Sequence, residues 1–321
     1  MLKISLSASK FLLVALALAL CVAAPASCSD NTNIDTSADT VTFVDALGRQ
    51  VKVSQNVKRV AALIGSFADV WMLSGGEICA TAEDAWDDFG LDLKDAVNIG
   101  GAHSPSLELL LSADPDFVIA SASTASNVEM KDMLESAGIT VAYFDVDNFQ
   151  DYLSMLDICT DITGRKDLYA QNGTNIQEQI DNIKKDVENA DLSQKERTVL
   201  LLRASSGSVK AKGSDGTILG EMLKELGCVN IADSDNSLLE NLSVESVIRQ
   251  EPYRIFVVTM GDDTQKAIDN LTNMMNEDPA WGTLDAVQND RLHVMDRKSF
   301  NIKPNANWAS SYEKLSEILL G

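Results

Sequence analysis

Histidine is scarce in this chain, which has 321 residues and only two histidines, His103 and His293. A protein site for free zinc or manganese normally brings several histidine and carboxylate ligands to one ion. Two histidines so far apart in the sequence do not favour such a site. We therefore predict no metal site built from side chains alone. Any metal that the protein handles would have to arrive already chelated.

Cysteine is also scarce, with five residues and no C-x-x-C pair. Two of them, Cys21 and Cys28, lie near the amino terminus. The other three, Cys79, Cys159 and Cys228, are widely spaced and odd in number, which favours neither a disulfide framework nor a zinc site. Their apolar neighbours favour thiols buried in a core. We assign these three cysteines no chemistry.

Positive charge is in deficit: lysine and arginine total 26 against 48 acidic residues, and the formal net charge is −22. No basic stripe could neutralise phosphates, so nucleic acid is not an expected partner. Catalytic motifs are missing as well, including a G-x-S-x-G elbow, H-E-x-x-H and a glycine-rich phosphate loop. Ser205-Ser206-Gly207-Ser208 has no visible histidine partner and is simplest as a loop after a strand. The sequence predicts no catalytic residue.

The amino terminus has the pattern of a secretory signal peptide. Lys3 and Lys10 precede an apolar run from residue 11 to 24. This run is shorter than the roughly 20 residues of a membrane-spanning helix. We therefore expect residues 1–26 to be a signal peptide and the mature protein to be exported.

Two processing sites compete at the end of the signal peptide. Ala24-Pro25-Ala26 fits the small-x-small rule, and cleavage there would leave Ser27 as the first residue. Alternatively, Cys28 and the polar segment after it resemble the lipid-modified cysteine and tether of a bacterial lipoprotein, although Pro25 stands where that pattern usually has leucine. We favour a lipid on Cys28, residues 27–40 as a flexible tether, and an anchor to the outer face of the cytoplasmic membrane.

The strongest helix signal runs from about residue 167 to 190. Ile176, Ile180, Ile183 and Val187 recur at intervals of three and four, which places them on one face of a helix. The remaining residues are mostly polar, so only a narrow stripe can be buried. At ~1.5 Å per residue this helix would be roughly 35 Å long. We predict that it joins two α/β halves; a surface helix within one domain is the alternative.

The rest of the chain alternates helical stretches with short apolar runs, after a predicted hairpin at residues 41–53. Continuous apolar runs favour strands that are buried on both faces of a parallel sheet. The runs lie at residues 59–64, 117–120, 140–144, 198–202, 255–258 and 292–295. The expected fold class is α/β, with two Rossmann-like lobes that have mostly parallel central sheets and are joined by a single long α-helix. We place the lobes at residues 41–165 and 192–321 and the helix at 166–191.

One pattern occurs in both halves. Ser106-Leu107-Glu108 begins a short helical run that ends at Pro115 before an apolar strand, and Ser243-Val244-Glu245 does the same before Pro252. Serine before a helix satisfies free N–H groups, and glutamate in the first turn is favoured by the helix dipole by ~0.3–1 kcal/mol. Helix capping alone explains the two acids. It does not explain their equivalent placement, which predicts one carboxylate per lobe for an outside partner to contact.

These residues carry a resemblance to a known family. The chain from about residue 41 to 319 resembles the substrate-binding proteins of ABC importers that serve iron–siderophore complexes, cobalamin and haem. The matching segments are residues 45–53, 58–60, 106–108, 115–119, 134–141, 219–227, 243–245, 279–281 and 286–292. The resemblance implies two α/β lobes joined by one long helix. It also implies that Glu108 and Glu245 pair with arginines of the permease dimer, where exposed charge pairs act mainly in orientation and encounter.

Ligands of open α/β sheets bind beyond the carboxyl ends of the strands. By that rule the candidate ligand contacts are Ser66, Trp86, Arg203, Met260 and Trp308. Arg203 ends an apolar strand, where its guanidinium needs an anionic partner. That partner is either an anionic ligand or a nearby acid in a structural ion pair, and the sequence leaves both open. Trp71 and Trp281 lie at helical spacing with apolar residues, which predicts core packing.

The expected function is therefore binding, with no catalysis and no resident cofactor. The protein would be a monomeric extracytoplasmic binding protein that captures a ferric siderophore or similar iron complex and delivers it to a permease. Cobalamin or haem is the alternative ligand within the same class. An exported two-lobed α/β enzyme is the alternative from another class, and a sensor that signals to a membrane receptor is a third.

Overall fold

The computed structural model describes residues 39–261 and 263–321. The predicted signal peptide at residues 1–26 and the predicted lipid site at Cys28 lie outside the described residues. Of the predicted tether at 27–40, only the last two residues are described, and Thr40 already begins the first strand. Within the described residues, no helix combines the length and the apolar character that crossing a membrane requires.

The first half of the chain forms a five-stranded parallel sheet with the order β5-β4-β3-β6-β7. An antiparallel hairpin of β1 and β2 precedes it, as the sequence predicted, and the backbone N–H of Ala46 in its turn donates to the carbonyl of Tyr143 at 2.8 Å. The strands are β1 Thr40–Val44, β2 Gln50–Ser54, β3 Val60–Ala62, β4 Ile78–Thr81, β5 Val97–Asn98, β6 Phe117–Ser121 and β7 Thr140–Phe144. The helices of this half are α1 Gly65–Leu73, α2 Asp84–Asp87, α3 Leu107–Ser112, α4 Ala125–Glu129, α5 Lys131–Ser136 and α6 Phe149–Thr163.

The second half forms another five-stranded sheet, in which β10, β8, β11 and β12 are parallel and β9 pairs with β8 in the antiparallel direction. The strands are β8 Thr198–Ala204, β9 Val209–Lys212, β10 Val229–Asn230, β11 Arg254–Thr259 and β12 Leu292–Met295. The helices are α9 Ile218–Glu225, α10 Asn236–Glu240, α11 Val244–Gln250, α12 Thr264–Glu277, α13 Asp285–Gln288, α14 Arg297–Phe300 and α15 Trp308–Leu320, with 3-10 turns at Ile231–Asp233, Pro279–Thr283 and Asn305–Asn307. The predicted α/β class with two mostly parallel sheets is confirmed.

Alternate residues of the central strands enter different cores, which explains their continuous hydrophobicity. Phe117 and Ile119 of β6 pack into one core, and Val118 and Ala120 pack into another on the opposite face of the sheet. The strands β8 and β11 divide in the same way. One of these cores takes one face from each of the two sheets, together with α6, α8 and α15. The two halves therefore share a continuous core.

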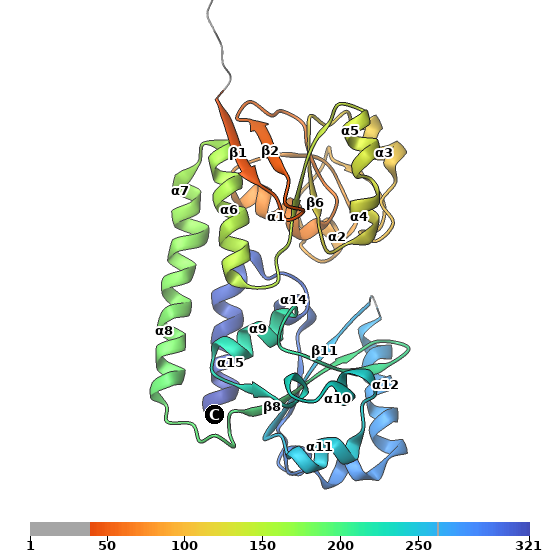
Figure 1. The fold of residues 1–321 in the computed structure, drawn as a ribbon, viewed down its shortest axis with the longest axis vertical. Coiled ribbons are helices and arrows are strands. Elements are labelled where there is room, and N and C mark those ends of the chain that lie inside the picture. Colours follow the sequence, from red (N-terminus) through yellow and green to blue (C-terminus); the bar gives the residue numbers. More distant parts are fainter. Residues whose placement is uncertain (1–38, 262) are drawn as a thin grey trace, which may run out of the picture. The chain divides into compact units, whose positions relative to one another are not determined.

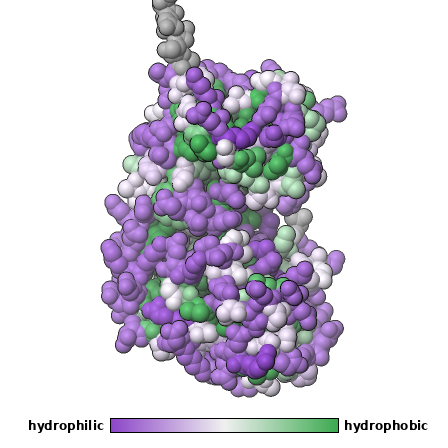
Figure 2. Space-filling model, viewed as in Figure 1, coloured by the Kyte–Doolittle hydropathy of each residue, from purple (hydrophilic) through white to green (hydrophobic). Residues whose placement is uncertain are grey.

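The helical connection between the halves is α7 (Lys166–Tyr169), a π-helical turn (Ala170–Thr174) and α8 (Asn175–Asn189), which follow one another directly after α6 ends at the left-handed Gly164. This is the single long helix that the sequence predicted (Figure 1). Ile176, Ile180 and Val187 of α8 are buried, and the remaining surface of the helix is mostly polar. Hydrophilic residues accordingly dominate the face shown in Figure 2.

The carboxyl-terminal segment packs against elements of the first half. α15 lies beside α8 (Figure 1), and the Trp308 ring meets that of Phe149 edge to face, with 5.9 Å between the ring centroids. Just before α15, the side-chain amide of Asn305 donates to the Ser66 carbonyl at 2.9 Å and to Asp69 Oδ2 at 2.8 Å. Residues near the end of the chain therefore support α1 and α6 as well as the second sheet.

Candidate functional site

The carboxyl ends of β11 and β12 border a pocket of about 530 Å³. Parallel sheets of this kind place ligands at this edge, and the volume lies within the ~300–1,000 Å³ of small-molecule sites. The lining residues are Asp88, Thr259, Thr264, Val294, Met295, Asp296, Arg297 and Lys298. Asp88 directly follows α2, so the pocket draws on both halves of the chain.

An ion pair joins the two halves at this pocket. A guanidinium nitrogen of Arg297, on α14, bonds to Asp88 Oδ1 just after α2, and 21% and 17% of the two side chains are exposed. Beside this pair, Lys298 Nζ donates to the carbonyl of Asp87 at 3.1 Å. A partly buried ion pair is screened less than a surface pair, so removing one partner leaves a costly charge. These contacts hold α14 against α2.

A double-mutant cycle on this pair is expected to show favourable coupling of about 1–2 kcal/mol in the free energy of unfolding. The variants are Arg297→Met, Asp88→Asn and the double variant, measured by urea denaturation. The matched control is the pair Lys94 and Asp92, whose side chains are 81% and 77% exposed and whose coupling should be close to zero. Equal coupling energies for the two pairs would contradict a structural role for the contact between Arg297 and Asp88.

The helix that carries Trp86 is fixed against the start of α1. Both carboxylate oxygens of Asp84 accept from the backbone N–H of Gly65, at 2.9 and 3.0 Å. Burial raises the pKa of Asp84, and the bond from Gly65 opposes that shift. A Cβ atom on Gly65 would lie 2.4 Å from the backbone nitrogen of Ala85, so only glycine allows this contact. Trp86 is half-buried and packs against the shared core.

The other predicted ligand contacts differ in how much surface they offer. Ser66 is only 5% exposed, whereas Met260, directly after β11, is 47% exposed. Trp308 is completely buried, and its ring packs against Phe149 and Tyr312. Because no surface of Trp308 is left for a ligand in this structure, we leave it out of the proposed site. Trp71 and Trp281 are 2% and 3% exposed, which confirms the predicted core packing.

Arg203 lies near the end of β8 and is partly buried. Its Nε is buried and has no hydrogen-bond partner within residues 39–261 and 263–321, and burial lowers the pKa of the guanidinium. Among the residues that the structure describes, no acid forms an ion pair with Arg203. The sequence left open whether Arg203 pairs with an anionic ligand or with a nearby acid of the protein. Among the described residues there is no such acid.

Arg203 opens onto a second pocket, of about 720 Å³, in the second half of the chain. The other lining residues are Ala211, Lys212, Gly213, Asp215, Gly216, Thr217, Lys224, Asp233 and Leu239. The sequence reasoning missed Lys210 and Lys212. The signal was available, because two lysines separated by one residue in a short strand point to the same face of a sheet. It missed Asp88 and Arg297 as well.

Glu108 and Glu245 are both exposed and occupy equivalent positions in the two halves. Each lies in the first turn of a short helix (α3 or α11) whose capping serine accepts from a backbone N–H three residues later, at 3.3 Å for Ser106 and 3.4 Å for Ser243. α3 leads into β6, which pairs with β3, and α11 leads into β11, which pairs with β8. β3 and β8 are each the first strand of their sheet in chain order. The equivalence suggested by the sequence is therefore present in the sheet topology.

The two acids differ in one local contact. Ser243 Oγ donates to Glu245 Oε2 at 2.8 Å, and this bond lowers the pKa of Glu245.

Neither half offers a protein-built metal site in its described part: no three His, Cys, Asp or Glu side chains within residues 39–261 and 263–321 group closely enough to hold an ion.

Comparison with known proteins gives matches over most of the chain. The model of a family described as periplasmic binding protein matches residues 60–298. The chain is 21% identical to Staphylococcus aureus SirA, solved in complex with staphyloferrin B, with a TM-score of 0.65 over 87% of this chain and 97% of that one. It is 20% identical to HutB, a periplasmic heme-binding protein of Vibrio cholerae, with a TM-score of 0.65 over 82% and 99%.

A further solved structure is the siderophore-binding protein BauB, bound to a complex of two acinetobactin molecules and ferric iron. The chain is 16% identical to it, with a TM-score of 0.71 over 88% of this chain and 100% of that one. At these identities the structural likeness shows the fold. No curated protein matches the chain.

Proposed function

Because this chain belongs to the periplasmic binding protein family, we propose that it captures a ferric siderophore or a similar iron complex outside the cytoplasm and delivers it to the permease of an ABC importer. The family and its structural relatives are binding proteins of transporters, not enzymes. The family is extracytoplasmic. We further propose that the mature protein is a monomer held at the membrane by a lipid on Cys28.

The observation that carries the proposal is the guanidinium of Arg203 at the carboxyl edge of a parallel sheet in this fold, whose Nε has no hydrogen-bond partner among the described residues. An arginine in such a place favours an anionic ligand, because its planar fork matches carboxylate and catecholate oxygens. SirA and BauB were solved with siderophores, which supports an iron complex as the cargo. HutB and other relatives bind haem, and haem is therefore included in the test.

We propose that Glu108 and Glu245 contact the permease. Their support is the equivalent placement on α3 and α11, with both side chains exposed. Charges at such a rim set the orientation and rate of encounter more than the final affinity. A pair of acids in equivalent positions fits a dimeric permease, because each lobe can then meet one subunit through the same kind of contact.

Tryptophan-fluorescence titration of the mature protein tests the cargo. Three of the four tryptophans are buried in cores, and Trp86 is the partly exposed one. We expect saturable quenching by at least one ferric siderophore, and a much smaller signal in the Trp86→Phe variant. The panel contains ferric carboxylate, catecholate and hydroxamate chelates, haemin and cyanocobalamin. Tight binding of cyanocobalamin alone, or of no member of the panel, would reject an iron complex as the cargo.

A further inference from the structure

Three cationic side chains project from one face of the β8–β9 pair. The register of these antiparallel strands places Arg203 opposite Lys210 and Leu201 opposite Lys212. Opposite residues of an antiparallel pair share a face, and alternate residues along a strand return to it. Arg203, Lys210 and Lys212 therefore lie on the face on which Leu201 is buried in the shared core.

These cations have no acidic partner in the described part of the chain. None of the ion pairs there includes Arg203, Lys210 or Lys212. Burial and the charges of Arg203 and Lys210 lower the pKa of Lys212, as expected for like charges held together without compensation. Acids outnumber bases by 48 to 26 in this protein. Three neighbouring cations without an ion-pair partner among the described residues are unusual in such an acidic chain, and they favour an external anion as the partner.

Two acids line the same pocket as Arg203 and Lys212, and each is bonded to another group. Asp215 pairs with Lys224, and Asp233 Oδ1 accepts from the backbone N–H of Ser214 at 2.7 Å. Both acids line the pocket of about 720 Å³ together with Arg203 and Lys212. Ala211 and Leu239 are the apolar side chains of that lining, and it contains no His, Cys, Met or Tyr, which are the usual ligands of haem iron. The pocket therefore suits a polar, negatively charged molecule.

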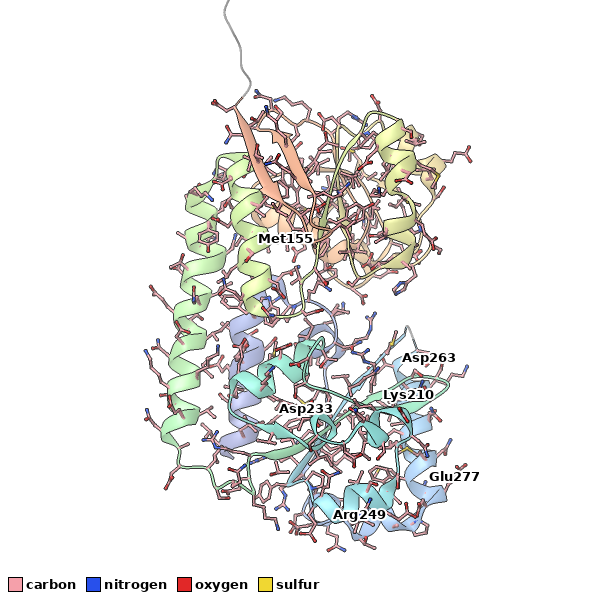
Figure 3. The ribbon with its side chains drawn as sticks, in the orientation of Figure 1. Met155, Lys210, Asp233, Arg249, Asp263 and Glu277 are labelled. Carbon is pink, nitrogen blue, oxygen red and sulfur yellow. The ribbon has the colours of Figure 1, made fainter. Side chains whose placement is uncertain are left out.

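The cluster is also well separated from the helix of the proposed permease contact. In Figure 3, Lys210 and Arg249 of α11 are labelled in the same half of the molecule, with Arg249 at the lower end of that half and Lys210 well above it. Glu245 lies on α11 as well. Substitutions at the cluster can therefore be judged by cargo binding alone.

We propose that Arg203, Lys210 and Lys212 form a binding site for the carboxylates of the cargo, so that the protein takes a polycarboxylate chelate of ferric iron in preference to a neutral hydroxamate chelate. This inference rests on the proposed function and specifies the chemical class of the cargo. Arg203 binds one carboxylate through two N–H groups, and the lysines supply compact positive charges to the other anionic groups.

Calorimetric titration with three probes tests the site: ferric citrate, a neutral ferric tris-hydroxamate and haemin. The proteins are wild type, Arg203→Gln, the double variant Lys210→Gln with Lys212→Gln, and the triple variant. We expect ferric citrate to bind wild type best, with affinity about tenfold lower in the arginine variant and at least about 100-fold lower in the triple variant. Affinity should also fall as salt is raised. Lys52→Gln, on strand β2, is the matched control and should bind normally.

The outcomes separate the two proposals. If wild type binds the hydroxamate or haemin more tightly than ferric citrate, and the triple variant binds it equally well, the carboxylate site is wrong while binding of an iron complex stands. If no iron complex binds to wild type, the proposed function itself fails. Circular dichroism establishes that each variant is folded, and the double lysine variant tests the site even if Arg203→Gln does not fold.

Discussion

Replacing Glu108 and Glu245 together with alanine is expected to lower uptake of the cargo by tenfold or more, while the Kd for the cargo stays within about twofold of wild type. Both side chains are exposed, and neither lines the pockets described above. If the proposed contacts exist, loss of either carboxylate removes one charge contact with the permease, and loss of both removes the charges that orient the protein on it. Uptake is measured with radioactive iron in cells, and Kd with the purified variant.

The matched control is Glu178→Ala with Glu188→Ala, which removes two exposed acids from α8. This control changes the net charge by the same amount and should transport normally. Equal loss of uptake in the two double variants would mean that net charge, not position, matters. Loss of cargo binding in parallel with uptake would overturn the assignment of these acids to the permease contact.

Replacing Trp308 with alanine is expected to lower the free energy of unfolding by about 3–5 kcal/mol, because the ring is completely buried and its removal leaves a large cavity. Trp308 packs between Phe149 of α6 and Tyr312 of its own helix. Its indole N–H has no hydrogen-bond partner in the described part of the chain, so Trp308→Phe should lower the free energy of unfolding much less. Urea denaturation measures both variants.

Cargo binding separates this packing role from ligand contact. Without urea and at a low temperature, where the Trp308→Ala variant stays folded, its Kd for the cargo should match that of wild type. Trp86→Ala is the contrasting variant, since Trp86 is half-buried, and we expect it to affect the Kd more than stability. Normal stability with weakened binding in Trp308→Ala would restore Trp308 to the ligand site.

Much of the fold could be predicted because each signal was local. Strands such as β6 and β11 are continuous apolar runs, and α8 has its narrow apolar stripe. Even the burial of Trp308 had a local signal: Trp308, Tyr312, Leu315 and Leu319 recur at helical spacing and are all buried. Assigning Trp308 to the ligand site from the position of its segment after a strand overlooked that stripe.

Contacts between distant segments could not be predicted in the same way. Arg297 and Asp88 are 209 positions apart, and the residues around each of them give no local pattern that predicts contact with the other. The amide of Asn305 reaches α1 across a similar separation. The absence of an acid beside Arg203 is a property of the folded surroundings, so the sequence could only leave its partner open. The equivalent acids Glu108 and Glu245 were recognisable because their helices repeat a local pattern.

The core that takes one face from each sheet has a mechanical consequence. Because α6, α8 and α15 are packed into it together, we expect the distance between α3 and α11 to change little when cargo enters. A transporter that touches both acids would then meet almost the same spacing in the loaded and the empty protein. The transporter would then have to distinguish the loaded from the empty protein by the surfaces around the cargo, not by the distance between the two glutamates.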